Sequence, residues 1–176
     1  MAIRFSTTTL HQAFLDALSP YVESHSNIEE KPLFVRLRAP HSLNLKVYLF
    51  NCTNPPGARQ AGEWKSQLIL PGQLRGQRGH FTLEPNVVTI LAGLASVTEL
   101  LEDAVFVIWE VNKHIDFAYS ANIQVSLSTL LRAYSDPLFT MKKRGNGEWV
   151  VISRPDYLVE ALKKRIDLDI DLLLEG

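Results

Sequence analysis

The residues best suited to chemistry gather between Lys46 and Phe81. Within Lys46–His80, five basic residues stand against the single acid Glu63, for a net charge of +4. Most other polar side chains in this stretch are Asn, Gln, Thr or Ser, which with Lys and Arg are the types that contact phosphates and base edges. The stretch therefore predicts a surface that reads nucleic acid, with two solvated hairpin loops as the alternative.

Two loops in this stretch hold most of the candidate contacts. The loop at 51–62 is stiffened by two prolines, and the loop at 71–80 carries arginines among three glycines, which let a backbone approach a phosphate closely. Neither loop has the GK[ST] of a Walker loop or the spacing of GxGxxG. The expected phosphate or guanine contacts are Arg59, Lys65, Arg75 and Arg78. The residues expected to read base edges or brace loops are Asn51, Asn54, Gln73 and Asn122.

One short fragment, Glu63-Trp64-Lys65, offers a catalytic alternative. It matches the E-x-K half of the PD-(D/E)xK nuclease signature, in which two carboxylates hold Mg²⁺ and the lysine steadies the attacking water. No Asp or Glu lies between Glu30 and Glu63, so the preceding strand supplies no second carboxylate. We expect no catalytic residue, metal or cofactor in this chain, with a nuclease that uses Glu63 and Lys65 as the alternative.

The composition sets the class of protein. With 176 residues and 46% hydrophobic content, the chain predicts one domain over 1–176. A net charge of −1 argues against a protein that coats nucleic acid indiscriminately. Residues 31–80 hold eight basic side chains and one acid, a net +7, which leaves −8 for the remainder. Such a division favours a localised anion-binding face.

The cysteine count and the apolar runs indicate a cytoplasmic protein. Cys52 is the only cysteine, which excludes an internal disulfide and a multi-cysteine zinc site. No apolar run approaches the roughly 20 residues of a membrane helix. We therefore expect a reducing cytoplasm and no membrane partner.

Apolar periodicity predicts helices at both ends of the chain and strands between them. The expected parts are an N-terminal helix at 9–24, capped by Thr8 or Thr9, a β-rich core at 33–152, a C-terminal helix at 153–166 and an acidic tail at 167–176. Within the core, strands are expected at 33–38, 45–50, 64–70, 87–94, 105–111 and 123–127, with a short helix at 128–134 and a hairpin at 141–152.

Because strands do not alternate with long helices, a parallel doubly wound sheet is disfavoured. The sequence predicts an α+β fold with a curled, mostly antiparallel sheet or a partly closed β-barrel, flanked by the two helices. The tail DLDIDLLLEG alternates acids with leucines, so a second functional alternative is a protein-interaction domain that docks a partner through this tail.

A family resemblance favours the nucleic-acid interpretation. The segments YLFNCTNPPGAR, EWKSQLILPGQ with RGQRGHF, VFVIWE and FAYSANIQV resemble the DNA-recognition modules of bacterial restriction–modification systems. Those modules are barrel-like and similar to SRA-type readers of modified cytosine and to the effector domains of EcoRII-like endonucleases. The resemblance spans 33–165. It implies a defence role, double-stranded DNA as the partner, loops 51–59 and 73–78 as the reading elements, and cleavage by another nuclease domain or subunit. The base-flipping pocket of an SRA domain does not map onto the sequence, which leaves preference for modified bases open.

Overall fold

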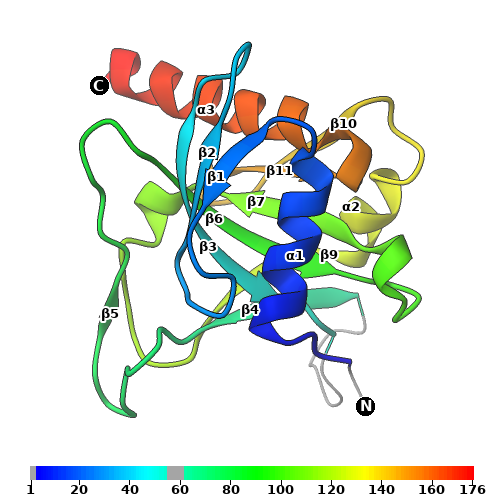
Figure 1. Cartoon of the computed structure of the whole chain (residues 1–176). Coiled ribbons are helices and arrows are strands. Elements are labelled where there is room, and N and C mark those ends of the chain that lie inside the picture. The colour runs from blue at the N-terminus through cyan, green and yellow to red at the C-terminus, as the bar shows by residue number, and fades with distance from the viewer. Residues whose placement is uncertain (1–2, 55–61) are drawn as a thin grey trace.

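The chain folds as an α+β protein around one open sheet, in a computed structural model that describes residues 3–54 and 62–176. Within the described residues the sheet has seven strands in the order β1-β2-β3-β6-β7-β11-β10 (Figure 1). The strands are β1 (Val22–His25), β2 (Leu33–Leu37), β3 (Asn44–Asn51), β6 (Val88–Ala95), β7 (Val105–Trp109), β11 (Trp149–Ser153) and β10 (Phe139–Lys143). Neighbours are antiparallel except β3 and β6, which are parallel. The expected fold class is confirmed, in its open form rather than as a closed barrel.

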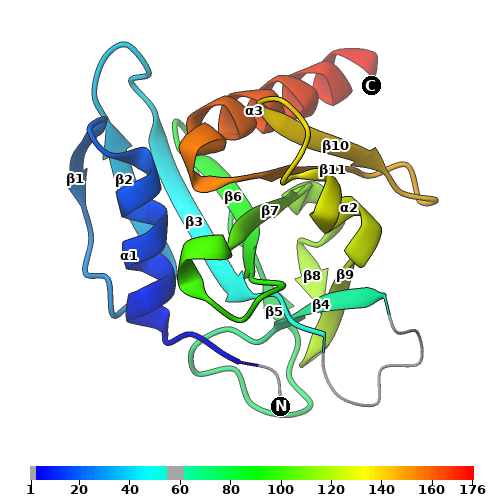
Figure 2. The same ribbon diagram turned by 90° about the vertical axis from the view of Figure 1, so that its right-hand side faces the viewer.

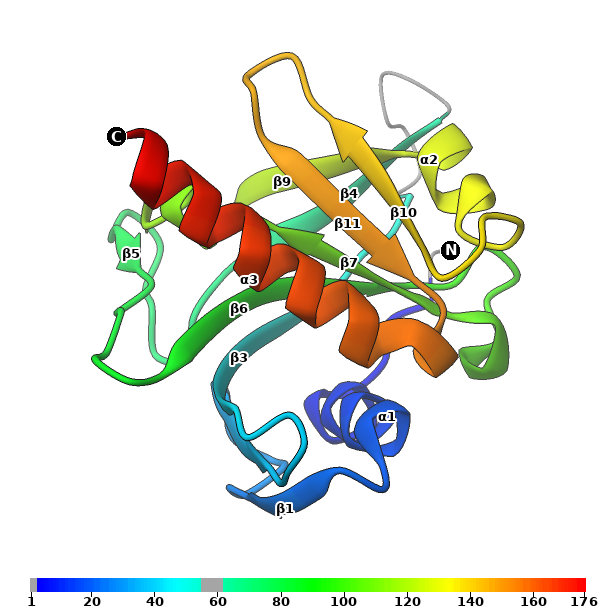
Figure 3. The same ribbon diagram turned by 90° about the horizontal axis from the view of Figure 1, so that it is seen from above.

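Helices α1 (Thr7–Leu18) and α3 (Leu158–Glu175) cover one face of this sheet. Figure 3 shows α3 crossing β11 and β7, while α1 lies against β3. Alternate residues of the strands, such as Val47 in β3 and Ile108 in β7, join the helices in one apolar core. The period-2 pattern of the strands therefore creates one face for the helices and a second face for a further layer.

A two-stranded ribbon covers the opposite face (Figure 2). It consists of β4 (Glu63–Leu68) and β9 (Ala121–Ser126), and it is accompanied by α2 (Leu127–Arg132) and by the short pair β5 (Gly79–His80) and β8 (Asp116–Phe117). Short 3-10 turns lie at Leu101–Asp103, Val111–Lys113 and Pro155–Tyr157. Trp109, which the sequence places in the core, is 1% exposed in this layer, and its indole Nε1 donates to the carbonyl of Gln124 at 3.1 Å.

The helices differ from their predicted bounds. Helix α1 begins and ends earlier than 9–24. It begins earlier because its cap is Ser6, rather than Thr8 or Thr9, and the Ser6 hydroxyl accepts from the Thr9 amide. Pro20 cannot continue the helix, and Val22–His25 pairs with β2 instead. Helix α3 begins after the turn at Pro155–Tyr157 and runs through the predicted acidic tail, so the tail is helical as far as Glu175.

The short helix α2 is also shifted from its expected position. The cap is Ser126, whose hydroxyl accepts from the Thr129 amide at 3.3 Å, so the helix begins one residue before the predicted 128. Leu130 is buried in the core, whereas Leu131 and Tyr134 are 50% and 38% exposed. Across the described residues, none of the helices combines the length and the apolar character that crossing a bilayer requires.

Candidate nucleic-acid interface

The β4–β9 ribbon presents a row of polar side chains away from the core. Its register pairs three sets of opposed residues: Glu63 with Ser126, Lys65 with Gln124, and Gln67 with Asn122. Directly opposed residues of an antiparallel pair lie on the same face. The alternate residues Ser66, Leu68, Ile123 and Val125 are buried beneath them. We call these six outward residues the ribbon face.

The ribbon face unites two of the predicted contacts, Lys65 and Asn122. Lys65 Nζ lies 3.9 Å from Glu63 Oε1, and the two side chains are 24% and 18% exposed. Asn122 and its neighbour Gln67 are exposed. Gln67 and Gln124 are not among the contacts predicted from the sequence, although strand alternation at 64–70 already places Gln67 beside Lys65 on the outward side.

The loop at 71–80 is held in shape by its own amides. Gln73 accepts from the Leu70 amide at 3.0 Å and donates to the Gln77 carbonyl at 3.0 Å, so it braces the loop. Gly76 has φ +85°, which a turn requires. Gly79 is buried, and a Cβ there would lie 2.5 Å from the Phe117 ring. This glycine therefore serves packing rather than close approach to a ligand.

The two arginines of this loop differ in whether an acid of the described chain pairs with them. Arg75 is exposed and forms no hydrogen bond or ion pair with the described part of the chain. Arg78 Nε donates to Asp116 Oδ1 at 2.5 Å, and both side chains are at least half exposed. Both arginines line a shallow hollow of about 460 Å³ with Ala118–Ser120, which directly precedes β9. One end of the ribbon face is therefore bordered by arginines.

The loop at 51–62 does not offer its first amide to a ligand. Asn51 accepts from the Phe5 amide at 2.8 Å and donates to the Phe5 carbonyl at 2.9 Å, so it anchors the N-terminal segment. Arg59 and the rest of 55–61 lie outside the described residues.

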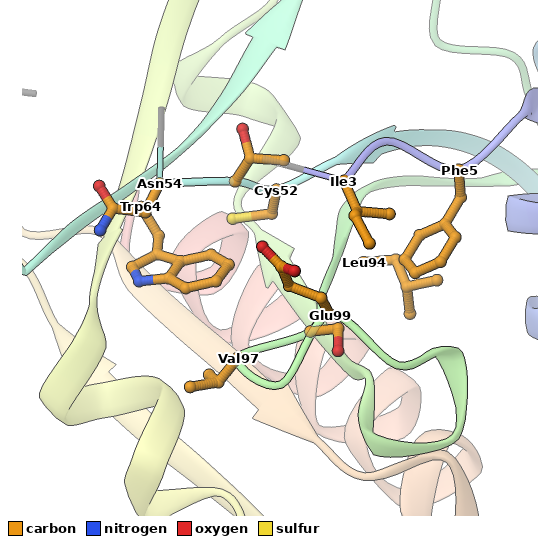
Figure 4. A pocket seen from close by; sticks show the side chains of 10 residues that line it. Ile3, Phe5, Cys52, Asn54, Trp64, Leu94, Val97 and Glu99 are labelled. Carbon is orange, nitrogen blue, oxygen red and sulfur yellow. The ribbon is translucent and has the colours of Figure 1, made fainter. Parts of the chain in front are cut away.

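Asn54 lines a pocket of about 200 Å³ with Trp64 and Glu99. Figure 4 shows the Glu99 carboxylate directed between Trp64 and Ile3, close to Cys52. Burial raises the pKa of the Cys52 thiol to about 12, which makes it a poor nucleophile at neutral pH.

The excess of positive charge in residues 31–80 does not form one continuous face. Lys46 is 3% exposed, and its Nζ lies 2.8 Å from Glu84 Oε1. Arg36 lies 3.4 Å from Glu23. Lys31 sits 3.9 Å from the Phe50 ring centre, and burial lowers its pKa to about 8. Ion pairs with acids outside the segment, together with burial, therefore remove much of the exposed positive charge that the sequence count suggests.

A second basic border lies at the other end of the ribbon, on the hairpin between β10 and β11. A hollow of about 440 Å³ separates this hairpin from the ribbon. Lys142, Lys143 and Arg144 line it on the hairpin side, and Glu63 and Gln124 line it on the ribbon side. The hairpin is predicted from the sequence, but this basic border is not among the predicted contacts, although three consecutive basic residues before a Gly-Asn-Gly turn indicate it.

No cluster of metal ligands accompanies Glu63. Within residues 3–54 and 62–176, no group of three or more His, Cys, Asp or Glu side chains is placed to hold a metal ion. Glu63 instead lies beside Lys65 and borders the basic hollow.

Comparison with known proteins supplies a family. The family model described as "Methylase-associated X1" matches residues 43–162, most of the chain and the whole of the ribbon. Comparisons with curated proteins and with solved structures found no match. A methylase-associated domain agrees with the resemblance to restriction–modification components. The chain belongs to the methylase-associated X1 family and fits a component of a restriction–modification system.

Proposed function

We propose that this protein is the DNA-recognition module of a restriction–modification system and that it reads duplex DNA through the ribbon face and the loop at 71–80. The observation that carries the proposal is the β4–β9 register, which sets Lys65 beside Gln124 and Gln67 beside Asn122 on one outward face. Methylation or cleavage is then the task of an accompanying methylase or nuclease subunit.

The dimensions and chemistry of the ribbon agree with this role. The major groove of DNA, about 12 Å wide, admits a two-stranded β-ribbon. Asn and Gln amides pair with adenine edges, and Lys pairs with guanine, so Asn122, Gln67 and Lys65 are the base-reading candidates. Arg75, which has no partner in the described chain, is the candidate for a phosphate at the edge of the groove.

This assignment moves base reading from the loops to the ribbon. The side-chain amide of Asn51 forms its hydrogen bonds with the Phe5 backbone, and that of Gln73 forms its hydrogen bonds with the backbone at the 71–80 loop. We place Arg75 ahead of Arg78, because Asp116 competes with DNA for the Arg78 guanidinium. Gly79, one of the three glycines expected to let this loop approach a phosphate, is packed against the Phe117 ring instead.

The first test compares Arg75→Ala and Arg78→Ala with the parent chain in binding to duplex DNA. Loss of a phosphate contact should weaken binding to every sequence alike and lower the slope of log Kd against log salt by about 0.9. We expect the larger loss for Arg75→Ala and nearly unchanged thermal stability for both, since exposed loop arginines support little core.

The matched control is Arg36→Ala, which removes an exposed arginine of β2 that is likewise paired with an acid, Glu23. It should bind DNA as the parent does. If both loop variants bind as the parent does at all salt concentrations, the loop is ordinary surface and takes no part in DNA binding.

A further inference from the structure

The hairpin between β10 and β11 carries its two lysines on opposite faces. Lys142 is paired with Val150, which belongs to the core layer beneath the ribbon. Lys143 is paired with Trp149, over whose ring its Nζ lies at 5.7 Å, and the neighbouring Met141 packs in the core on the helix side. Since successive strand residues alternate in direction, Lys142 faces the hollow beside the ribbon, whereas Lys143, which also lines the hollow, turns its ammonium over the Trp149 ring.

A buried carboxylate fixes the hairpin in this position. Glu148 has no exposed side-chain surface, and its Oε1 accepts from Arg144 at 2.8 Å. Its other oxygen lies 2.7 Å from His114 Nε2 and accepts from the Glu110 amide at 3.1 Å. The turn is closed by the Arg144 amide, which donates to the Glu148 carbonyl, and by Gly147 at φ +87°. The backbone that carries Lys142 is therefore held in place before a ligand binds, so binding does not have to order the hairpin.

Lys142 is exposed and uncompensated. It forms no hydrogen bond or ion pair with the described residues, whereas Arg144 is neutralised by Glu148. At Gly145, in the turn of the hairpin, no heavy atom lies within 4 Å of the place where a Cβ would stand, so the tip of the hairpin is open. A positive charge held next to a hollow of about 440 Å³ suits a strongly anionic ligand.

We infer that the hollow between the β10–β11 hairpin and the β4–β9 ribbon is a second phosphate-contact site, in which Lys142 binds the backbone of the duplex whose bases the ribbon face reads. This inference rests on the proposed function and extends it from the arginine-bordered end of the ribbon to the opposite end. A duplex laid along the ribbon would then be held by cations on both sides, with the carboxamides of Gln67 and Gln124 between them.

An acidic protein surface is the alternative ligand for this hollow, and the side chains of the ribbon favour DNA over it. The wall opposite Lys142 contains Glu63, which disfavours a carboxylate-rich surface and a phosphate alike, so the choice between them rests on the adjoining side chains. The adjoining side chains are amides with both donors and acceptors, which pair with base edges but give no preference for carboxylates.

The test measures binding of a labelled mixed-sequence duplex to the full chain between about 50 and 200 mM salt. Lys142→Ala should lower the slope of log Kd against log salt by about 0.9 and weaken binding to all sequences alike. The matched control is Lys163→Ala, which removes the same charge from an exposed position of α3, on the face of the sheet opposite the ribbon, and should leave the slope unchanged. Equal thermal unfolding of both variants confirms that the hairpin is intact.

The outcomes separate this inference from the proposed function. If the parent binds DNA and Arg75→Ala weakens it, but Lys142→Ala matches the parent, the second site is wrong and the proposed function stands. Equal slopes for Lys142→Ala and Lys163→Ala contradict it in the same way. If the parent binds poly-L-glutamate as tightly as DNA and Lys142→Ala abolishes that binding, the hollow belongs to an acidic protein instead. A parent that binds no duplex overturns both proposals.

Discussion

At the scale of single residues, Glu148 shows how a buried charge is made stable. Burial by itself would raise the pKa of its carboxyl group. The hydrogen bonds from His114, Arg144 and the Glu110 amide outweigh burial, so the pKa lies below its ordinary value. The fold therefore favours the ionised form of Glu148, and the hairpin position depends on that charge.

This gives a pH dependence with a defined sign. A carboxyl group whose pKa is lower in the folded state contributes stability above its unfolded pKa of about 4.3, and the contribution disappears as pH falls toward the folded pKa. Urea unfolding of the parent over a pH series should show this loss, and Glu148→Gln should lack that component. The control, Glu160→Gln at an exposed position of α3, should follow the parent. Parallel curves for the parent and Glu148→Gln would contradict the assignment.

At the scale of elements, the spacing between β6 and the ribbon layer depends on Gly93. A Cβ at this buried position would lie 2.8 Å from Ser66 Oγ, 3.0 Å from the Trp109 ring and 3.1 Å from the Cys52 Cβ. All three neighbours are buried, so none of them has solvent to move into. The strand can therefore approach the layer above it only where a side chain is missing.

We expect Gly93→Ala to lower the free energy of unfolding by about 1–3 kcal/mol through overpacking. Gly145→Ala is the matched control, because no heavy atom lies within 4 Å of the Cβ it would add. Chemical unfolding of the two variants measures the difference. Equal stability of the two variants would mean that the layers adjust freely at Gly93.

Most elements could be predicted because their signals are local. Alternation places β2 and β3, and the Gly-Asn-Gly turn places the hairpin. The parallel pairing of β3 with β6 could not be predicted, since contacts distant in sequence decide it. In the site, Lys65 and Asn122 follow from strand pairing. Asn51 differs, because an amide looks the same in sequence whether it binds a base or braces Phe5.

At the scale of the whole molecule, the proposed DNA contacts place positive charge at the two ends of one ribbon rather than spread over one segment. Arg75 and Arg78 border one end and Lys142 the other, while Lys46 is buried within the fold. A chain with a net charge of −1 can bind DNA selectively in this way, because only a correctly oriented duplex meets both cationic borders.

The nuclease alternative leads to a separate prediction. Glu63 has Lys65 as its charged neighbour, and no cluster of metal ligands occurs within the described residues. We expect no cleavage of plasmid DNA by the isolated chain with Mg²⁺ present. Glu63→Ala serves as the control for a contaminating nuclease, since residual cleavage should be equal in both. Cleavage by the parent that disappears in Glu63→Ala would show that the chain is an enzyme.

The measurement that tests the central claim most directly is selection from a randomised duplex library, prepared with and without methylated cytosine. The account predicts that the parent enriches a defined motif, and that the double variant Gln67→Ala, Asn122→Ala loses the motif while it keeps salt-dependent binding, because base contacts specify and phosphate contacts position. Gln12→Ala, an exposed amide on α1, should enrich the parental motif. No enrichment by the parent, or the same motif from the double variant, would contradict base reading by the ribbon face.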